Sequence, residues 1–236
     1  MGSTNKKNQG ALSRRGAIAG AAALAFAGGG ARPAGSETAQ DATLVMLGDS
    51  LTSGFGLSRS EALPAKLEER LRADGYAVRV VNAGVAGDTT AAGLARFDWA
   101  TGDGADAVLI ALGGNDLLRG LEPEISRQNL DAMIQKADAR GLPVMLAGMR
   151  APRNWGEAHR TAFDRIYADL AAAYGVALHP FLLDGVAGVP TLNQVDGIHP
   201  NTDGVAVIAR ALAASTATFL DQNMLGTTPQ PADQQH

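Results

Sequence analysis

A serine, a histidine and an aspartate stand where they could act together as nucleophile, base and orienting acid. Ser50 follows the apolar run Thr43–Leu47 after Gly48 and Asp49 and precedes a segment with several glycines. A serine hydroxyl at such a turn is a poor nucleophile until a base removes its proton. Asp196 and His199 lie three residues apart in a polar segment, close enough for the carboxylate to orient the imidazole while the other ring nitrogen accepts the Ser50 proton.

Each of these residues also has a plainer interpretation. A serine or aspartate after a strand can simply cap a helix. Thr52 stands where a Gly-x-Ser-x-Gly elbow would have its second glycine. His199 could be a structural histidine of a turn and Asp196 a loop or capping residue. Taken singly, the three residues leave both interpretations open.

Acyl transfer also needs hydrogen-bond donors for the oxyanion. Gly84 can present its backbone N–H without an obstructing side chain, Asn115 can offer its side-chain NH2, and Ser50 its own N–H. The loss of one such donor costs ~10²–10³ in turnover. The alternatives are a tight turn at Gly84 and an Asx-turn at Asn115.

The elements that would position these residues follow a repeating order. Short apolar runs alternate with segments of helical spacing, such as the repeat Leu63, Leu67 and Leu71 and the last segment at about Thr202–Leu220. This alternation predicts an α/β fold whose parallel sheet is covered on both faces. The predicted strands are Thr43–Leu47, Ala77–Val81, Ala107–Leu112, Pro143–Gly148 and Val176–Leu178.

Three polar, glycine-bearing loops follow the first three predicted strands. They are Gly48–Thr52, Asn82–Gly84 and Gly113–Asp116. In parallel sheets the working residues gather beyond the carboxyl ends of the strands. We therefore expect all three loops to open onto one edge of the sheet.

Between about Thr43 and Leu220 the sequence resembles the GDSL or SGNH hydrolases. The blocks that carry this resemblance are Gly48-Asp49-Ser50-Leu51, Asn82-Ala83-Gly84, Gly114-Asn115-Asp116 and Asp196-Gly197-Ile198-His199-Pro200. Gly87-Asp88-Thr89-Thr90 and Leu118-Arg119-Gly120 are similar to the bacterial arylesterase, acyl-thioesterase and lysophospholipase branch. The resemblance implies a three-layer α/β/α sandwich around a central five-stranded parallel sheet, of the flavodoxin-like SGNH hydrolase kind.

The resemblance also implies roles for single residues. Ser50 is expected as nucleophile, His199 as base and Asp196 as its orienter, with an oxyanion hole from Ser50, Gly84 and Asn115. No metal and no cofactor are expected. Leu117 and Leu118 are either core residues or part of an acyl-binding wall. Trp155 belongs to a loop, Met149–Trp155, that is expected beside the acyl-binding groove.

The two ends of the chain differ from the predicted domain at residues 42–222. Residues 1–27 carry basic residues, a short apolar run and a small-x-small site, which predicts an export signal and a periplasmic or secreted protein. The pair Arg14-Arg15 resembles a twin-arginine signal. A disordered Ala-rich leader or a membrane-associated helix is the alternative. Residues 28–41 are predicted as a linker and residues 223–236 as a disordered tail.

Composition excludes several classes of protein. The chain has no cysteine, and without residues 1–27 it holds 16 basic and 24 acidic residues, a net charge near −8. Such a chain repels phosphate backbones, so no nucleic-acid partner is expected. We also expect no stable membrane insertion and a monomer.

The blocks together favour a serine esterase that hydrolyses acyl esters or thioesters through an acyl-enzyme on Ser50. The expected substrates are aryl esters, short- to medium-chain acyl esters and lysophospholipids. Two alternatives remain open. A carbohydrate-ester deacetylase would use the same triad, and a non-catalytic envelope binding protein would use the same scaffold without chemistry.

Overall fold

The computed structural model describes residues 41–226, which form an α/β fold. The strands are β1 (Ala42–Gly48), β2 (Val78–Gly84), β3 (Ala107–Ala111), β4 (Val144–Ala147) and β5 (Ala177–His179). The helices are α1 (Ser50–Ser53), α2 (Leu63–Ala73), α3 (Thr90–Ala95), α4 (Phe97–Thr101), α5 (Gly114–Leu118), α6 (Pro123–Asp138), α7 (Glu157–Tyr174) and α8 (Thr202–Gln222). Two short 3₁₀ turns are η1 (Arg153–Trp155) and η2 (Pro190–Leu192).

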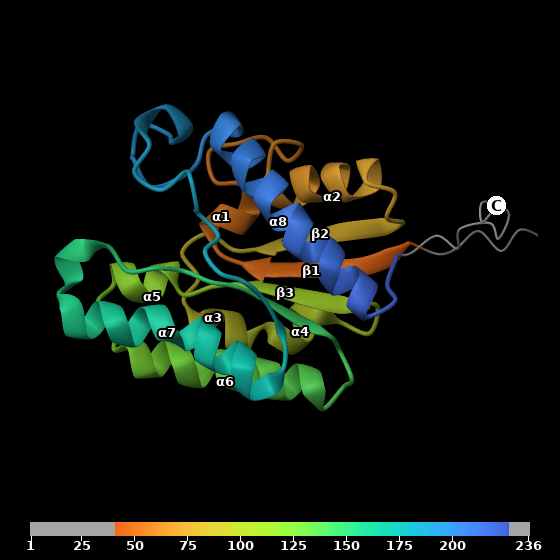
Figure 1. Ribbon diagram of the computed structural model, residues 1–236, viewed down its shortest axis with the longest axis horizontal. Coiled ribbons are helices and arrows are strands. Elements are labelled where there is room, and N and C mark those ends of the chain that lie inside the picture. Colours follow the sequence, from red (N-terminus) through yellow and green to blue (C-terminus); the bar gives the residue numbers. More distant parts are fainter. Residues whose placement is uncertain (1–40, 227–236) are drawn as a thin grey trace, which may run out of the picture. The chain divides into compact units, whose positions relative to one another are not determined.

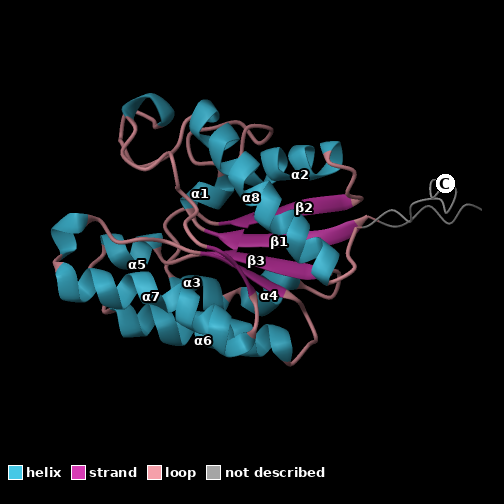
Figure 2. Ribbon diagram, viewed as in Figure 1, coloured by secondary structure: helices cyan, strands magenta, loops and turns pink. Residues whose placement is uncertain are grey.

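The strands form one parallel sheet in the order β2-β1-β3-β4-β5. Helices α1, α2 and α8 cover one face of the sheet, and α3 to α7 cover the other (Figures 1 and 2). The predicted three-layer sandwich with a five-stranded parallel sheet is therefore confirmed. Strands β1 and β3 are buried along their whole length, as the unbroken apolar runs predicted.

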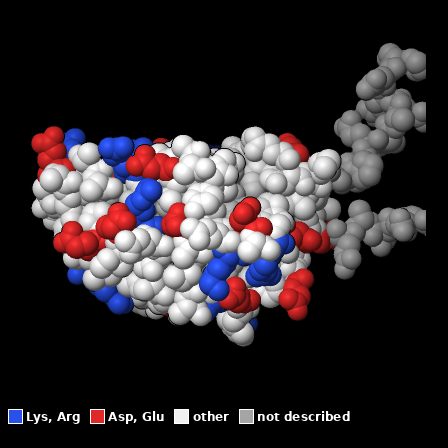
Figure 3. Space-filling view, turned by 90° about the horizontal axis from the view of Figure 1, so that it is seen from below, with Lys and Arg blue, Asp and Glu red and all other residues white. Residues whose placement is uncertain are grey.

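The helices bury the apolar positions that their spacing predicted. Leu63, Leu67 and Leu71 of α2 are buried, and α8 packs closely against α2. Among the described helices, α8 is long and apolar enough to cross a membrane, with a mean hydropathy of 1.3 over 18 residues, but half of that window is buried within the fold. The face seen from below in Figure 3 carries acidic and basic side chains interspersed.

Strand β2 lies at one edge of the sheet, and a side chain covers part of that edge. Glu68 of α2 accepts a hydrogen bond from the backbone N–H of Val80 at 2.7 Å. Unpaired backbone groups on an edge strand invite pairing with other chains, and a charged side chain at the edge opposes this. Glu68 therefore occupies a donor that β1 cannot reach.

Strand β1 begins at Ala42 and helix α8 ends at Gln222, and that these residues bound the domain stays a prediction. The predicted tail at 223–236 is wrong for its first residues. Leu225 packs against the core, and the carbonyl of Gly226 accepts a hydrogen bond from Ala77 N–H at 2.8 Å. The predicted export signal at 1–27, nearly all of the linker at 28–41 and residues 227–236 of the tail lie outside the described residues.

Candidate active site

The turn after β1 places Ser50 at the first position of α1. Asp49 is the N-cap of this short helix, and its Oδ1 accepts the Leu51 N–H at 3.0 Å. Gly48 has no room for a side chain, because a Cβ there would lie 2.0 Å from the Thr52 hydroxyl oxygen. A small residue and a capping acid thus bring Ser50 to the carboxyl edge of the sheet, the left side of Figure 1.

Ser50, His199 and Asp196 form one hydrogen-bonded chain, although 149 residues separate the first two in sequence. The Ser50 hydroxyl lies 2.9 Å from His199 Nε2, and His199 Nδ1 lies 2.6 Å from Asp196 Oδ2. When Nδ1 carries its proton toward the carboxylate, Nε2 is free to accept the proton of the serine. The sequence prediction for these three residues matches this arrangement.

The segment before α8 holds the imidazole in place. Asp196 Oδ1 accepts the backbone N–H groups of Ile198 at 2.9 Å and His199 at 3.0 Å. The hydrogen bond from the His199 N–H, then that from its ring and that from Ile198, lower the pKa of Asp196 to about 2. Asp196 is therefore a carboxylate at any neutral or mildly acidic pH. The Phe55 ring, 4.6 Å from the His199 ring between centroids, covers the imidazole.

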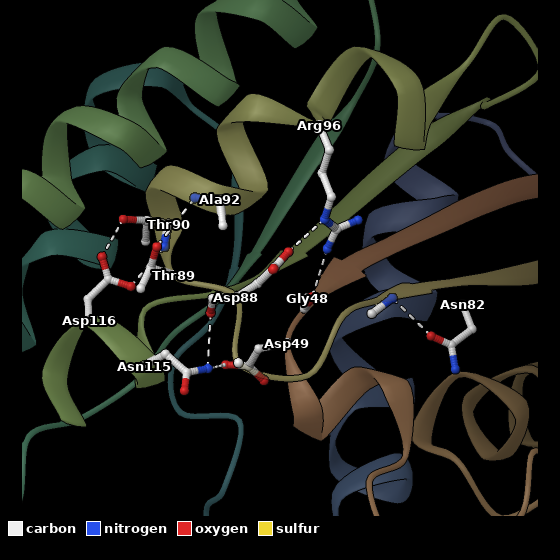
Figure 4. A network of polar contacts seen from close by, with 12 residues as sticks. Gly48, Asp49, Asn82, Asp88, Thr89, Thr90, Ala92, Arg96, Asn115 and Asp116 are labelled. Atoms are coloured by element: carbon white, nitrogen blue, oxygen red, sulfur yellow. Dashed lines mark hydrogen bonds and ion pairs between the residues drawn. The ribbon is translucent and has the colours of Figure 1, made fainter. Parts of the chain in front are cut away.

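The amide of Asn115 lies between two loops (Figure 4). Its Nδ2 donates to the backbone carbonyl of Asp88 at 3.0 Å and to Asp49 Oδ2 at 3.2 Å. Were the amide rotated by 180°, its oxygen would face two acceptors. These contacts therefore fix which end of the Asn115 amide faces the Asp49 and Asp88 loops, and its predicted role as an oxyanion donor stays a prediction.

Gly84 does not have the environment that the sequence predicted. Its N–H donates to the Oδ1 of Asn82 at 3.0 Å, two residues back along β2. It lines a different cavity, together with Arg59 and Glu68. A Cβ at Gly84 would lie 2.2 Å from Ser53 N, so the glycine is required by close packing against α1. The prediction of an oxyanion donor at Gly84 is corrected on these grounds.

A cavity of about 330 Å³ opens beside Ser50 and His199. Leu117 and Leu118 both line it, and Leu118 is 59% exposed. Trp155, predicted beside the same groove, is not among its lining residues. The indole instead stacks on His159 with ring centroids 5.1 Å apart and packs against Gly120. The sequence placed Trp155 in the right loop but did not identify its partners.

Asp49 is a site residue whose role the sequence analysis missed beyond helix capping. Its side chain is buried, and this desolvation raises its pKa from 3.8 to about 6, against the opposing effects of the Leu51 N–H, His199 and Asn115. The position of an acid between a buried strand and the candidate nucleophile is the signal that could have revealed it.

Burial of Asp49 predicts a particular pH dependence of stability. The folded state retains a proton between about pH 4 and 6 that the unfolded chain releases, so this stabilisation is present below about pH 4 and is lost as pH rises through about 6. Relative to Asp49→Asn, the free energy of unfolding of the parent should fall by up to about 3 kcal/mol over this window. Urea unfolding of both proteins at pH 4, 5, 6 and 7 measures it. A difference that stays constant with pH would contradict the burial.

Comparison with known proteins agrees with this geometry. Residues 46–207 match the GDSL-like Lipase/Acylhydrolase family. The chain is 47% identical over 159 residues to "Esterase TesA" of Pseudomonas aeruginosa, covering 67% of this chain and 79% of that protein. It is 40% identical over 172 residues to "Thioesterase 1/protease 1/lysophospholipase L1" of Escherichia coli K12, covering 72% and 81% respectively.

A solved structure gives the same result in three dimensions. The crystal structure of a protein named TesA superimposes with a TM-score of 0.72 at 42% identity, covering 75% of this chain and 99% of that one. The hydrogen-bonded Ser50, the parallel sheet that carries it and the similarity to these relatives all indicate the same family. The chain belongs to the GDSL-like lipase/acylhydrolase family and is a serine esterase.

Proposed function

We propose that this esterase hydrolyses acyl esters and thioesters through an acyl-enzyme on Ser50. The observation that carries the proposal is the continuous hydrogen-bonded chain from Ser50 Oγ through His199 to Asp196. Ser50 Oγ attacks the acyl carbonyl while His199 Nε2 takes its proton. His199 then protonates the leaving oxygen or sulfur, and a water activated in the same way releases the acid.

The cavity beside the triad supports an acyl chain of short to medium length. Its apolar wall includes Leu117, Met149 and Leu183, and its volume of about 330 Å³ lies at the lower end of the range for small-molecule pockets, ~300–1,000 Å³. The relatives are named for esterase, thioesterase and lysophospholipase activities. Ester and thioester substrates with different leaving groups are consistent with a site that binds mainly the acyl group of the substrate.

The oxyanion would be held by Ser50 N–H, Asn115 Nδ2 and, in place of Gly84, the N–H of Gly87. Gly87 has a φ of 86°, and among the described residues no group accepts a hydrogen bond from its N–H. Its own carbonyl is taken by Arg119 at 2.8 Å, and the next carbonyl, of Asp88, by Asn115. The Gly87-Asp88 turn therefore lies against the other proposed donor.

Arg96 would hold this turn and the Ser50 turn at a fixed distance (Figure 4). Its Nε donates to Asp88 Oδ2 at 2.6 Å, and its Nη2 donates to the carbonyl of Gly48 at 2.9 Å. Both side chains are largely buried, at 17% and 13% exposed, so water screens the pair less than a surface salt bridge. Arg96 thus links the strand end before the nucleophile to the loop that orients Asn115.

The first prediction concerns the nucleophile. Hydrolysis of p-nitrophenyl esters by Ser50→Ala should fall at least about 10³-fold, because attack on the carbonyl needs the hydroxyl. The parent should prefer short to medium acyl chains across a length series. Ser53→Ala is the matched control, since its hydroxyl lies in the same short helix and contacts only Ser50 O, at 3.3 Å. A parent that cleaves acetylated sugars but no acyl ester would contradict the proposal.

The second prediction concerns the oxyanion donors. In a crystal structure of the Ser50 adduct with an alkyl phosphonate, the charged oxygen should lie about 2.7–3.1 Å from Gly87 N, Asn115 Nδ2 and Ser50 N. The Gly84 N–H should remain bonded to Asn82. A phosphonate oxygen on Gly84 N instead would restore the original assignment.

The third prediction concerns Arg96. Arg96→Met should lower kcat about 10- to 100-fold while KM changes less than about twofold, because misplaced donors weaken transition-state binding. The double variant Arg96→Met/Asn115→Ala should lose less activity than the two single losses combined, because part of the Arg96 effect is exerted through Asn115.

Arg140→Met is the matched control for Arg96. Arg140 also donates to a backbone and a hydroxyl oxygen, those of Gly102 and Thr101. These lie at the end of α4, toward the amino-terminal ends of the strands and away from the candidate site. Its substitution should leave kcat unchanged. Additive effects of the Arg96 and Asn115 substitutions would contradict an action of Arg96 through Asn115.

A further inference from the structure

An arginine lines the otherwise largely apolar wall of the catalytic cavity. Arg150 lies in the loop after β4, and the ionisable residues that line the cavity with it are Asp49 and His199. Asp49 accepts a hydrogen bond from Asn115, and His199 belongs to the triad. Arg150 is exposed, so its charge is accessible from solvent and from the cavity that it lines.

The Arg150 guanidinium is held in a defined place without its charge being neutralised. Its Cζ lies 5.2 Å from the centre of the Phe181 ring, which lines the same cavity. A cation–π contact with the ring does not use the N–H groups of the guanidinium as hydrogen-bond donors, so these remain available. An arginine held near a ring in this way loses less freedom when it binds an anion than one that moves freely.

Arg150 has no acidic partner in the described part of the chain. Within residues 41–226 no carboxylate lies within 4.0 Å of its guanidinium. Asp164 on α7, an acid that packs against this loop, accepts the N–H of Ala151 at 2.8 Å. A cation on an apolar wall with unused donors is suited to an anionic group of a bound ligand.

We propose that Arg150 binds a phosphate group of the substrate while the acyl chain occupies the apolar part of the cavity. This rests on the proposed function, because the acyl group must reach Ser50. The planar N–H fork of arginine matches two oxygens of a phosphate. The phosphate belongs either to the headgroup of a single-chain phospholipid or to the carrier of an acyl thioester. In both cases Arg150 selects phosphate-bearing amphiphiles over neutral esters of the same chain length.

The test compares four substrates with the same octanoyl chain, below their micelle concentrations. Two are oxygen esters, octanoyl-lysophosphatidylglycerol and the neutral monooctanoylglycerol. Two are thioesters, octanoyl-coenzyme A and the neutral octanoyl-N-acetylcysteamine. In Arg150→Gln the ratio of kcat/KM for the phosphate-bearing to the neutral substrate should fall at least about tenfold, mainly through KM. Arg150→Lys should retain part of the ratio, because it keeps the charge but loses the fork.

Arg153→Gln is the matched control, because Arg153 is exposed in the same loop but does not line the cavity. Its substitution should leave both ratios unchanged. A fall confined to the oxygen esters would identify the lipid headgroup as the source of the phosphate, and one confined to the thioesters would identify the carrier. Ratios that stay constant in Arg150→Gln would overturn the proposal.

Binding to an inactive protein separates this proposal from the proposed function. With Ser50→Ala, the Kd of octanoyl-lysophosphatidylglycerol and of octanoyl-coenzyme A, measured by calorimetry, should rise at least about tenfold for one or both when Arg150→Gln is added. A parent that hydrolyses none of the four substrates would refute the esterase mechanism, whereas these Kd values would still decide on Arg150. Equal Kd values with and without Arg150 would overturn the phosphate site alone.

Discussion

The orientation of one amide group connects the parts of this site. Asn115 Nδ2 lies 3.0 Å from the carbonyl of Asp88 and 3.2 Å from the carboxyl of Asp49, and so joins loops from three strands. The longer contact, to Asp49, is the one that a bound oxyanion would share or replace. A side-chain amide has no intrinsic preference between its two ends, and only its partners determine which end faces a ligand. Arg96 joins two of those loops, because it donates to Asp88 in one and to the carbonyl of Gly48 before the other. The catalytic edge is thus built as a network of short contacts rather than as a set of independent residues.

This network explains why a buried acid is kept beside the nucleophile. Burial raises the pKa of Asp49 to about 6, which means that its ionised form is destabilised inside the protein. In return, Asp49 caps α1 and orients Asn115. A local arrangement that works against stability is a common feature of functional sites. By contrast, Asp196 is stabilised as an anion by N–H donors, so the two aspartates of the site have opposite electrostatic environments.

Much of the fold and of the triad could be predicted because both depend on simple rules. Unbroken apolar runs predicted buried parallel strands, and the carboxyl ends of such strands meet at one edge, which brought Ser50 and Asn115 together. The pair Asp196 and His199 is local, but its spacing alone left its role open, and the resemblance to the GDSL hydrolases implied the triad. No comparable rule exists for a backbone N–H, whose direction depends on the turn that contains it.

The errors share this cause. Gly84 ends the second strand and Gly87 lies three residues further on, and the Gly84 N–H is bonded to the Asn82 side chain whereas Gly87 has a φ of 86°. Trp155 was placed correctly in sequence, but the ring it stacks on lies on a neighbouring helix. The chain after α8 is polar in composition, yet the carbonyl of Gly226 pairs with the start of the sheet region. Each outcome depends on a specific contact that composition does not encode.

The hydrogen bond between Glu68 of α2 and the edge strand β2 has a consequence for how the protein behaves at high concentration. An open edge is a template on which another polypeptide can add a strand, the first step toward amyloid-like growth. Here an incoming strand would have to displace the carboxylate from Val80 N–H and accept its negative charge nearby. At the opposite edge β5 offers only three residues. Both margins of the sheet are therefore poor sites for templated aggregation.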